Sequence, residues 1–216
     1  MINKLDKALN RLKHILPIKD RQDSCEPQIK SLHQKILQSF VTQGRILNTD
    51  EMSQWVDDIS QSIDVLSKND MVIFSENREP IGAYPFTMSE REHMVLVNGF
   101  KVHAMCALDA LAIAPMFKTN TDIHSQCRVT GEVISIQMSG ETIKNQNEAS
   151  DIYFGITWGA SDSMLSCADS LCLEMVFLKD YDTAKKWQSD DTTERETFTL
   201  QEAVQFSSRF FVPLLT

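Results

Sequence analysis

The sequence lacks any long apolar run. Its 216 residues contain no stretch of the roughly 18–20 apolar residues that a membrane span requires. The N-terminal MINKLDKALNRLKHILPIKDR follows the spacing of an amphipathic helix and has no continuous apolar core like that of a signal peptide. We therefore expect a cytoplasmic protein with no membrane partner. Its five cysteines are then expected to be thiols, and their odd number leaves at least one unpaired.

Positive charge is scarce outside the N-terminal part of the chain. Residues 1–47 hold nine Lys and Arg against four Asp and Glu, so this part carries +5 and the rest carries −14 of the net −9. An acidic body repels phosphates, so nucleic acid is not expected as the principal ligand. The basic segment is interpreted as a solvated helix face, with contact to an acidic partner as the alternative.

Several common catalytic motifs are also missing. The sequence has no glycine-rich phosphate loop, no G-x-S-x-G elbow, no H-E-x-x-H and no C-x-x-C. The remaining candidates for chemistry are cysteine, aspartate and histidine.

Helical periodicity dominates the first 70 residues, and good N-cap residues precede its third segment. Helices followed by a hairpin are the outline of a winged-helix domain. The predicted elements are helices over 2–16 and 28–43, a capped segment over 48–59, and another helix after it through Ile63, Val65 and Leu66. A polar linker at 19–27 and a hairpin of 71–74 with 83–87 are predicted as well.

From residue 93 the pattern changes to short strands around turn residues such as Asn98-Gly99. A helical domain joined to an α+β domain is the resulting prediction. The elements predicted here are two strands within 93–104, a buried helix within 103–117, two strands within 122–140 around Thr130-Gly131, strands over 151–158 and 170–178, the latter holding Cys172, and helices over 182–187 and 200–211.

The segment HAMCALDALAIAPMF, residues 103–117, places Cys106 and Asp109 three residues apart, where two helical side chains share a face. A carboxylate among apolar side chains is costly unless it is paired or used. One interpretation is a reactive thiol with Asp109 as proton acceptor or donor, and another is a small core cysteine. A third is a zinc site formed by His103-x-x-Cys106 and His124-x-x-Cys127.

The combination VHAMCALDALAIAPMF, DIHSQCRVTGEVISI and SLCLEMVFL…DTAKKW resembles the alkylmercury (organomercurial) lyase family. That family has a C-A-L-D-T-L motif with a catalytic cysteine and aspartate, then S-x-C-x-x-T-G, then a second catalytic cysteine before a short apolar strand. The matching positions are Cys106 and Asp109, Cys127 with Thr130-Gly131, and Cys172. The likeness runs from about residue 30 to 210 and leaves the first 25 residues as an extension.

The resemblance implies an α+β fold of an N-terminal extension (1–26), a winged-helix-like helical domain (27–90) and a catalytic domain of short antiparallel sheets and helices (91–216). It implies protonolysis of a carbon–mercury bond to a hydrocarbon and Hg(II), with Cys106, Asp109 and Cys172 as catalytic residues that also hold the mercury. It implies no cofactor, because mercury is substrate and product. Small thiols would be co-substrates, and a mercuric reductase would receive Hg(II).

Other residues have plainer interpretations. Cys127 is expected to serve packing, Cys25 to be free and exposed in the linker, and Cys167 to be incidental, with a third thiol near Cys172 as its alternative. His103 and His124 are expected to be ordinary strand residues. Met105 replaces the aromatic residue that the family commonly has before the first cysteine, which bears on the substrate range.

Two other classes of function remain open. A non-catalytic protein of the same fold could hold a soft metal with these cysteines, and it would release no hydrocarbon. A winged-helix DNA-binding regulator is disfavoured because residues 48–69 contain no basic recognition helix, and a gel shift at physiological salt would test it.

Overall fold

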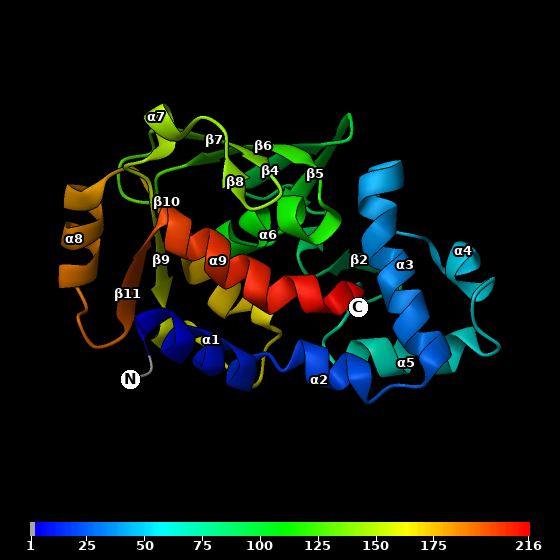
Figure 1. The fold of residues 1–216 in the computed structure, drawn as a ribbon. Coiled ribbons are helices and arrows are strands. Elements are labelled where there is room, and N and C mark those ends of the chain that lie inside the picture. Colours follow the sequence, from blue (N-terminus) through cyan, green and yellow to red (C-terminus); the bar gives the residue numbers. More distant parts are fainter. Residues whose placement is uncertain (1–2) are drawn as a thin grey trace.

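The structure is a computed structural model that describes residues 3–216 and combines helices with antiparallel sheets (Figure 1). Residues 1 and 2, where the predicted extension and first helix begin, lie outside the described residues. The α-helices are α1 (Lys4–Ile15), α2 (Ile18–Asp23), α3 (Pro27–Gln43), α4 (Thr49–Ser53), α5 (Ile59–Lys68), α6 (Ala107–Phe117), α7 (Gln146–Ala149), α8 (Tyr181–Ser189) and α9 (Leu200–Phe211). Short 3₁₀ turns are η1 (Trp158–Ala160), η2 (Cys167–Asp169), η3 (Leu171–Glu174) and η4 (Val212–Leu215).

Within residues 3–216 the strands form one eight-stranded and one three-stranded sheet, and all pairings within the sheets are antiparallel. The larger sheet has the order β1 (Ile73–Phe74), β2 (Pro80–Ala83), β3 (Phe86–Thr87), β5 (Phe100–Ala104), β4 (His93–Val97), β6 (Asn120–Gln126), β7 (Val133–Ser139), β8 (Thr142–Ile143). The smaller has the order β10 (Met175–Leu178), β9 (Tyr153–Thr157), β11 (Arg195–Thr199). An isolated bridge from Cys127 to Phe177 connects the two sheets.

Helix α6 lies at the centre of the molecule, between the larger sheet and α9 (Figure 1). Ten of its eleven residues are buried, which explains why apolar residues surround the helix instead of following one face. Because α6 also packs on β10, it contacts both sheets. Side chains at its N-terminus are therefore held in the interior.

The N-terminal helices pack on the C-terminal end of the chain (Figure 1). Arg209 in α9 pairs with Asp6 in α1 at 2.8 Å. The amide of Gln22, fully buried, donates to the carbonyl of Leu214 at 2.9 Å. The predicted polar linker at 19–27 is therefore wrong: most of it forms α2 and the start of α3, because Ile18 and Gln22 have buried partners that composition does not reveal.

Most predicted elements are confirmed within a few residues. They include α1 and α3, the capped start of α4 at Asn48, the Asn98-Gly99 hairpin, and α8 and α9. The hairpin of β1 and β2 also forms, but its second strand is β2, which begins at Pro80 and ends at Ala83. The chain then reverses, and β3, the end of the predicted strand 83–87, pairs antiparallel with β2 and with β5. The winged-helix assignment and the domain boundaries at 26/27 and 90/91 stay predictions, while one hydrophobic core runs from α1 to η4.

Among residues 3–216, none of the helices combines the length and apolar character needed to cross a membrane.

Candidate active site

The first cysteine begins the central helix. Cys106 is the N-cap of α6, with extended backbone at φ −151° and ψ 178°. Its sulfur accepts the backbone N–H of Asp109 at 3.4 Å, in the place that a Ser, Thr, Asn or Asp oxygen usually takes. This cap contact holds the Cys106 thiol close to Asp109, which follows about one helical turn later. The sequence spacing therefore positions Cys106 and Asp109 locally.

Cys172 reaches the same place from a distant part of the chain. It lies in the 3₁₀ turn η3, just before β10, so the prediction that a strand holds it is wrong. The turn connects the loop 161–170 to β10, and it packs against β9, η1 and η2, while β10 packs on α6. The sulfur of Cys172 lies 3.9 Å from Oδ2 of Asp109. The ligand atoms of Cys106, Asp109 and Cys172 all lie within 4.8 Å of one another.

The Asp109 carboxyl group is isolated from water. Its side chain is 1% exposed, and within residues 3–216 its Oδ1 has no hydrogen-bond partner. Burial raises the pKa of Asp109 from its ordinary value of 3.8 to about 7, although the Cys106 thiol and the positive charge of Arg91 act in the opposite direction. A carboxyl group with this pKa can both accept and donate a proton near neutral pH.

Both thiols are protonated in the free protein at neutral pH. Burial raises the pKa of Cys106 to about 12. The neighbouring thiols Cys106 and Cys167, together with burial, raise the pKa of Cys172 well above its ordinary range. A metal bound here must therefore displace thiol protons, which need an acceptor nearby.

Arg91 joins the segments that carry the two cysteines, a contact that no sequence pattern predicts. Its Nη1 donates to the carbonyl of Met105 at 3.2 Å and to that of Ala168 at 2.8 Å. Its Nη2 lies 3.4 Å from a carboxylate oxygen of Asp169. One guanidinium group thus joins the residue before Cys106 to the loop before Cys172, a role that only the folded chain reveals.

A pocket of about 250 Å³ leads to this cluster. Cys172 lines it, while the other two members of the cluster lie deeper and are each 1% exposed. A ligand entering the pocket therefore meets Cys172 first. The remaining lining residues are Arg91, Glu92, His93, Met105, Arg128 and Leu173.

The zinc alternative is wrong. Among residues 3–216 the cluster of Cys106, Asp109 and Cys172 is the one group of three or more potential metal ligands, and it contains no histidine. His103 Nδ1 lies 3.0 Å from the carbonyl of Arg91 instead. Cys127 is buried where β6 ends and the bridge to Phe177 forms, which agrees with a packing role.

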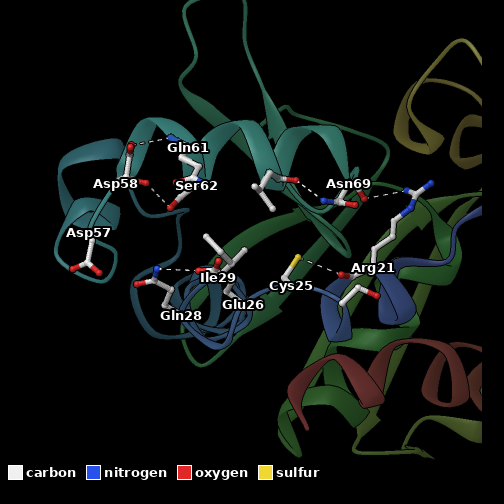
Figure 2. A pocket seen from close by; sticks show the side chains of 12 residues that line it. Arg21, Cys25, Glu26, Gln28, Ile29, Asp57, Asp58, Gln61, Ser62 and Asn69 are labelled. Carbon is white, nitrogen blue, oxygen red and sulfur yellow. Dashed lines mark hydrogen bonds between the residues drawn. The ribbon is translucent and has the colours of Figure 1, made fainter.

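Cys25 lines a separate pocket of about 510 Å³ beside α3 and α5 (Figure 2). It is half-buried, not exposed as predicted, because its thiol donates to the carbonyl of Arg21 at 3.2 Å. The residues of this pocket do not include any member of the Cys106–Asp109–Cys172 cluster. Cys25 thus stands apart from the candidate active site.

Comparison with known proteins agrees with this fold and identifies a family. The family model of the alkylmercury lyases, MerB, matches residues 86–212. The alkylmercury lyases of Bacillus cereus and Clostridium butyricum are each 27% identical to the chain over 101 residues, which is 47% of this chain and 45% of each relative. The match therefore spans about half the length of these relatives.

Among solved structures, the crystal structure of the mercury-bound form of MerB2 superposes with a TM-score of 0.74, covering 92% of this chain and 98% of that one. At 17% identity this likeness establishes the fold alone. The family match covers more than half of the chain and includes the segments of all three clustered residues. The chain belongs to the alkylmercury lyase family.

Proposed function

We propose that this protein cleaves the carbon–mercury bond of organomercurials by protonolysis, R–Hg–X giving R–H and Hg(II). The observation that carries the proposal is the cluster itself: two thiols and a carboxyl group within 4.8 Å of one another, buried at the end of a pocket. Thiolates are the preferred ligands of soft metals such as mercury. A carboxyl group with a pKa of about 7 supplies the proton that the departing carbon needs.

Capture begins at Cys172, which lines the pocket. Its sulfur replaces the ligand X on mercury, and its proton leaves with X. Cys106 then gives its proton to the Asp109 carboxylate and forms the second sulfur–mercury bond. Two sulfur ligands raise the electron density on the metal and weaken the bond to carbon.

The protonated Asp109 then delivers its proton to carbon. The carbon–mercury bond breaks, its electron pair forms the new C–H bond, and Hg(II) stays on the two sulfurs. Asp109 returns to the carboxylate form, so it is not consumed. The buried site favours this transfer because it keeps competing water away from the carboxyl group.

The product must leave by thiol exchange. Small thiols are the proposed co-substrates that return both cysteines to the protonated form, and a mercuric reductase is the proposed receiver of Hg(II). No further cofactor is needed in this scheme. A cytoplasmic location is the accompanying proposal, since free thiols persist in a reducing compartment.

The test measures hydrocarbon in the headspace over purified protein with an alkyl- or arylmercurial and excess small thiol. Repeated turnover is expected, with more hydrocarbon released than protein present. A non-catalytic soft-metal binder would take up the organomercurial in stoichiometric amount and release no hydrocarbon. That result would overturn the enzymatic proposal and leave the binding protein as the function.

A further inference from the structure

A third thiol lies against the proposed active site. The sulfur of Cys167, in η2, is 3.7 Å from that of Cys172. Its side chain is 6% exposed, so this is an interior contact. Cys172 is therefore shared between two thiol pairs, one with Cys106 and one with Cys167, and the proposed cleavage uses only the first.

The two thiols of the second pair face different pockets. Cys172 lines the pocket of about 250 Å³ described above. Cys167 lines another of about 520 Å³, bounded by the loop 161–170 and by residues of α1, α2 and α5. The two linings share no residue. An ion that moves from the Cys106–Cys172 pair to the Cys172–Cys167 pair therefore changes the pocket through which it can leave.

Polar contacts that are buried or partly buried fix the position of Cys167. Its backbone N–H donates to Oδ2 of Asp70 at 3.3 Å, and the N–H of Ala168 donates to the Tyr84 hydroxyl at 2.8 Å. The Tyr84 hydroxyl in turn donates to Asp70 at 3.1 Å, and the Tyr84 ring is fully buried. These contacts attach the loop to the end of α5, so the thiol is held beside Cys172 by the packing of two parts of the chain.

We propose that Cys167 accepts the product Hg(II) from Cys106 while Cys172 keeps its bond to the metal, so that a small thiol can collect the ion from the pocket beside α1, α2 and α5. The origin of the ion rests on the proposed lyase function. The sulfur of Cys167 loses its proton and bonds to Hg(II), the Cys106–mercury bond breaks, and the Cys106 sulfur takes up a proton. Mercury stays Hg(II), and two small thiols then replace Cys167 and Cys172 as its ligands, returning their protons.

The first experiment uses inorganic Hg(II) on the full chain, without any organomercurial. The Cys106→Ser variant is expected to bind one Hg(II) with two sulfur ligands by X-ray absorption spectroscopy. Adding Cys167→Ser should remove one sulfur and weaken binding by at least about 100-fold in competition with a small dithiol, because thiolates supply most of the affinity for a soft metal. Adding Cys25→Ser instead is the matched control and should change neither value.

Equal affinity and sulfur number in Cys106→Ser and Cys106→Ser/Cys167→Ser would overturn the second site. This result is independent of the lyase activity, because no carbon–mercury bond is involved. Circular dichroism and the thermal midpoint confirm that each variant is folded, and Cys167→Ala replaces Cys167→Ser if the hydroxyl destabilises the loop.

A second experiment follows the protein through its turnovers with excess organomercurial and small thiol. In Cys167→Ser, later turnovers should become about tenfold slower relative to the first, which appears as a burst of hydrocarbon. The Cys25→Ser control should keep the wild-type ratio. An unchanged ratio in Cys167→Ser would contradict the transfer route, whereas absence of hydrocarbon from the wild type would contradict the lyase function instead.

Discussion

The sulfur of Cys172 lies 3.9 Å from Oδ2 of Asp109, although 62 residues separate them in the chain. The contact places a thiol that faces the pocket beside a carboxyl group with no access to water. In the proposed reaction the first binds the metal and the second moves the proton, so the two roles can be separated by mutation.

Replacing Asp109 by Asn should abolish cleavage of the carbon–mercury bond but preserve binding of the organomercurial. The amide has nearly the same size but cannot deliver a proton, so hydrocarbon release should fall by about 10²–10⁴-fold. Binding of the organomercurial should remain stoichiometric, because two thiolates provide it. Asp122→Asn, the same change on β6 outside the cluster, is the control. Wild-type turnover by Asp109→Asn would show that the proton comes from another group.

Either clustered cysteine should be essential, whereas Cys127 should not be. Cys106→Ala and Cys172→Ala each leave one sulfur ligand and should abolish turnover. Cys127→Ala removes a buried sulfur between the sheets and should lower the free energy of unfolding by about 1 kcal/mol while cleavage continues. Hydrocarbon release and urea unfolding of the three variants test this. Full activity of Cys172→Ala would remove it from the site and favour Cys167 in its place.

Arg91 should act as a positioning residue. Arg91→Met removes the hydrogen bonds that join Met105 to Ala168, and a small displacement of the two cysteines should slow cleavage by about 100-fold. Arg45→Met, at the surface pair with Glu51, should leave the rate unchanged. The extent of Hg(II) binding at saturation should be retained in both variants. Equal rates in both would rule out the positioning role.

The stability of the protein should depend on pH through three buried groups. Burial lowers the pKa of His33 to about 4 and that of His93 to about 3, so below pH 6.5 the unfolded state binds protons that the native state does not, and stability falls. Asp109 acts in the opposite sense: its pKa rises to about 7, so its native carboxyl group holds a proton that the unfolded chain lacks down to pH 3.8.

Asp109→Asn removes this compensation. Between pH 6.5 and 4.5 the free energy of unfolding of the variant should fall more steeply on acidification than that of the wild type. The difference corresponds to the uptake of about one proton, or about 1.4 kcal/mol per pH unit. At pH 8, where the native carboxylate is charged and buried, the variant should be more stable by as much as about 4 kcal/mol, the equivalent of the pKa rise from 3.8 to about 7. Urea unfolding across this range measures both effects, and parallel curves would contradict the assigned burial of the charge.

The sequence by itself determined the features that depend on near neighbours. Asn48 and its partner Glu51 form the capping box of α4, the Asn98-Gly99 pair reverses the chain between β4 and β5, and the spacing of Cys106 and Asp109 puts a thiol beside a carboxyl group. The motif order also indicated which distant cysteine belongs with them. The sequence alone predicts these features because each depends only on the backbone geometry of a few neighbouring residues.

Only the tertiary structure decided what depends on packing between distant segments. The segment 19–27 becomes largely helical because Gln22 finds the carbonyl of Leu214. Cys172 lies outside the predicted strand because its segment forms the turn η3, which packs on β9, η1 and η2. The 3.7 Å contact of Cys167 with Cys172 has the same origin. Composition cannot encode such contacts, since the free energy that fixes them comes from burial and from hydrogen bonds that exist only once both partners are in place.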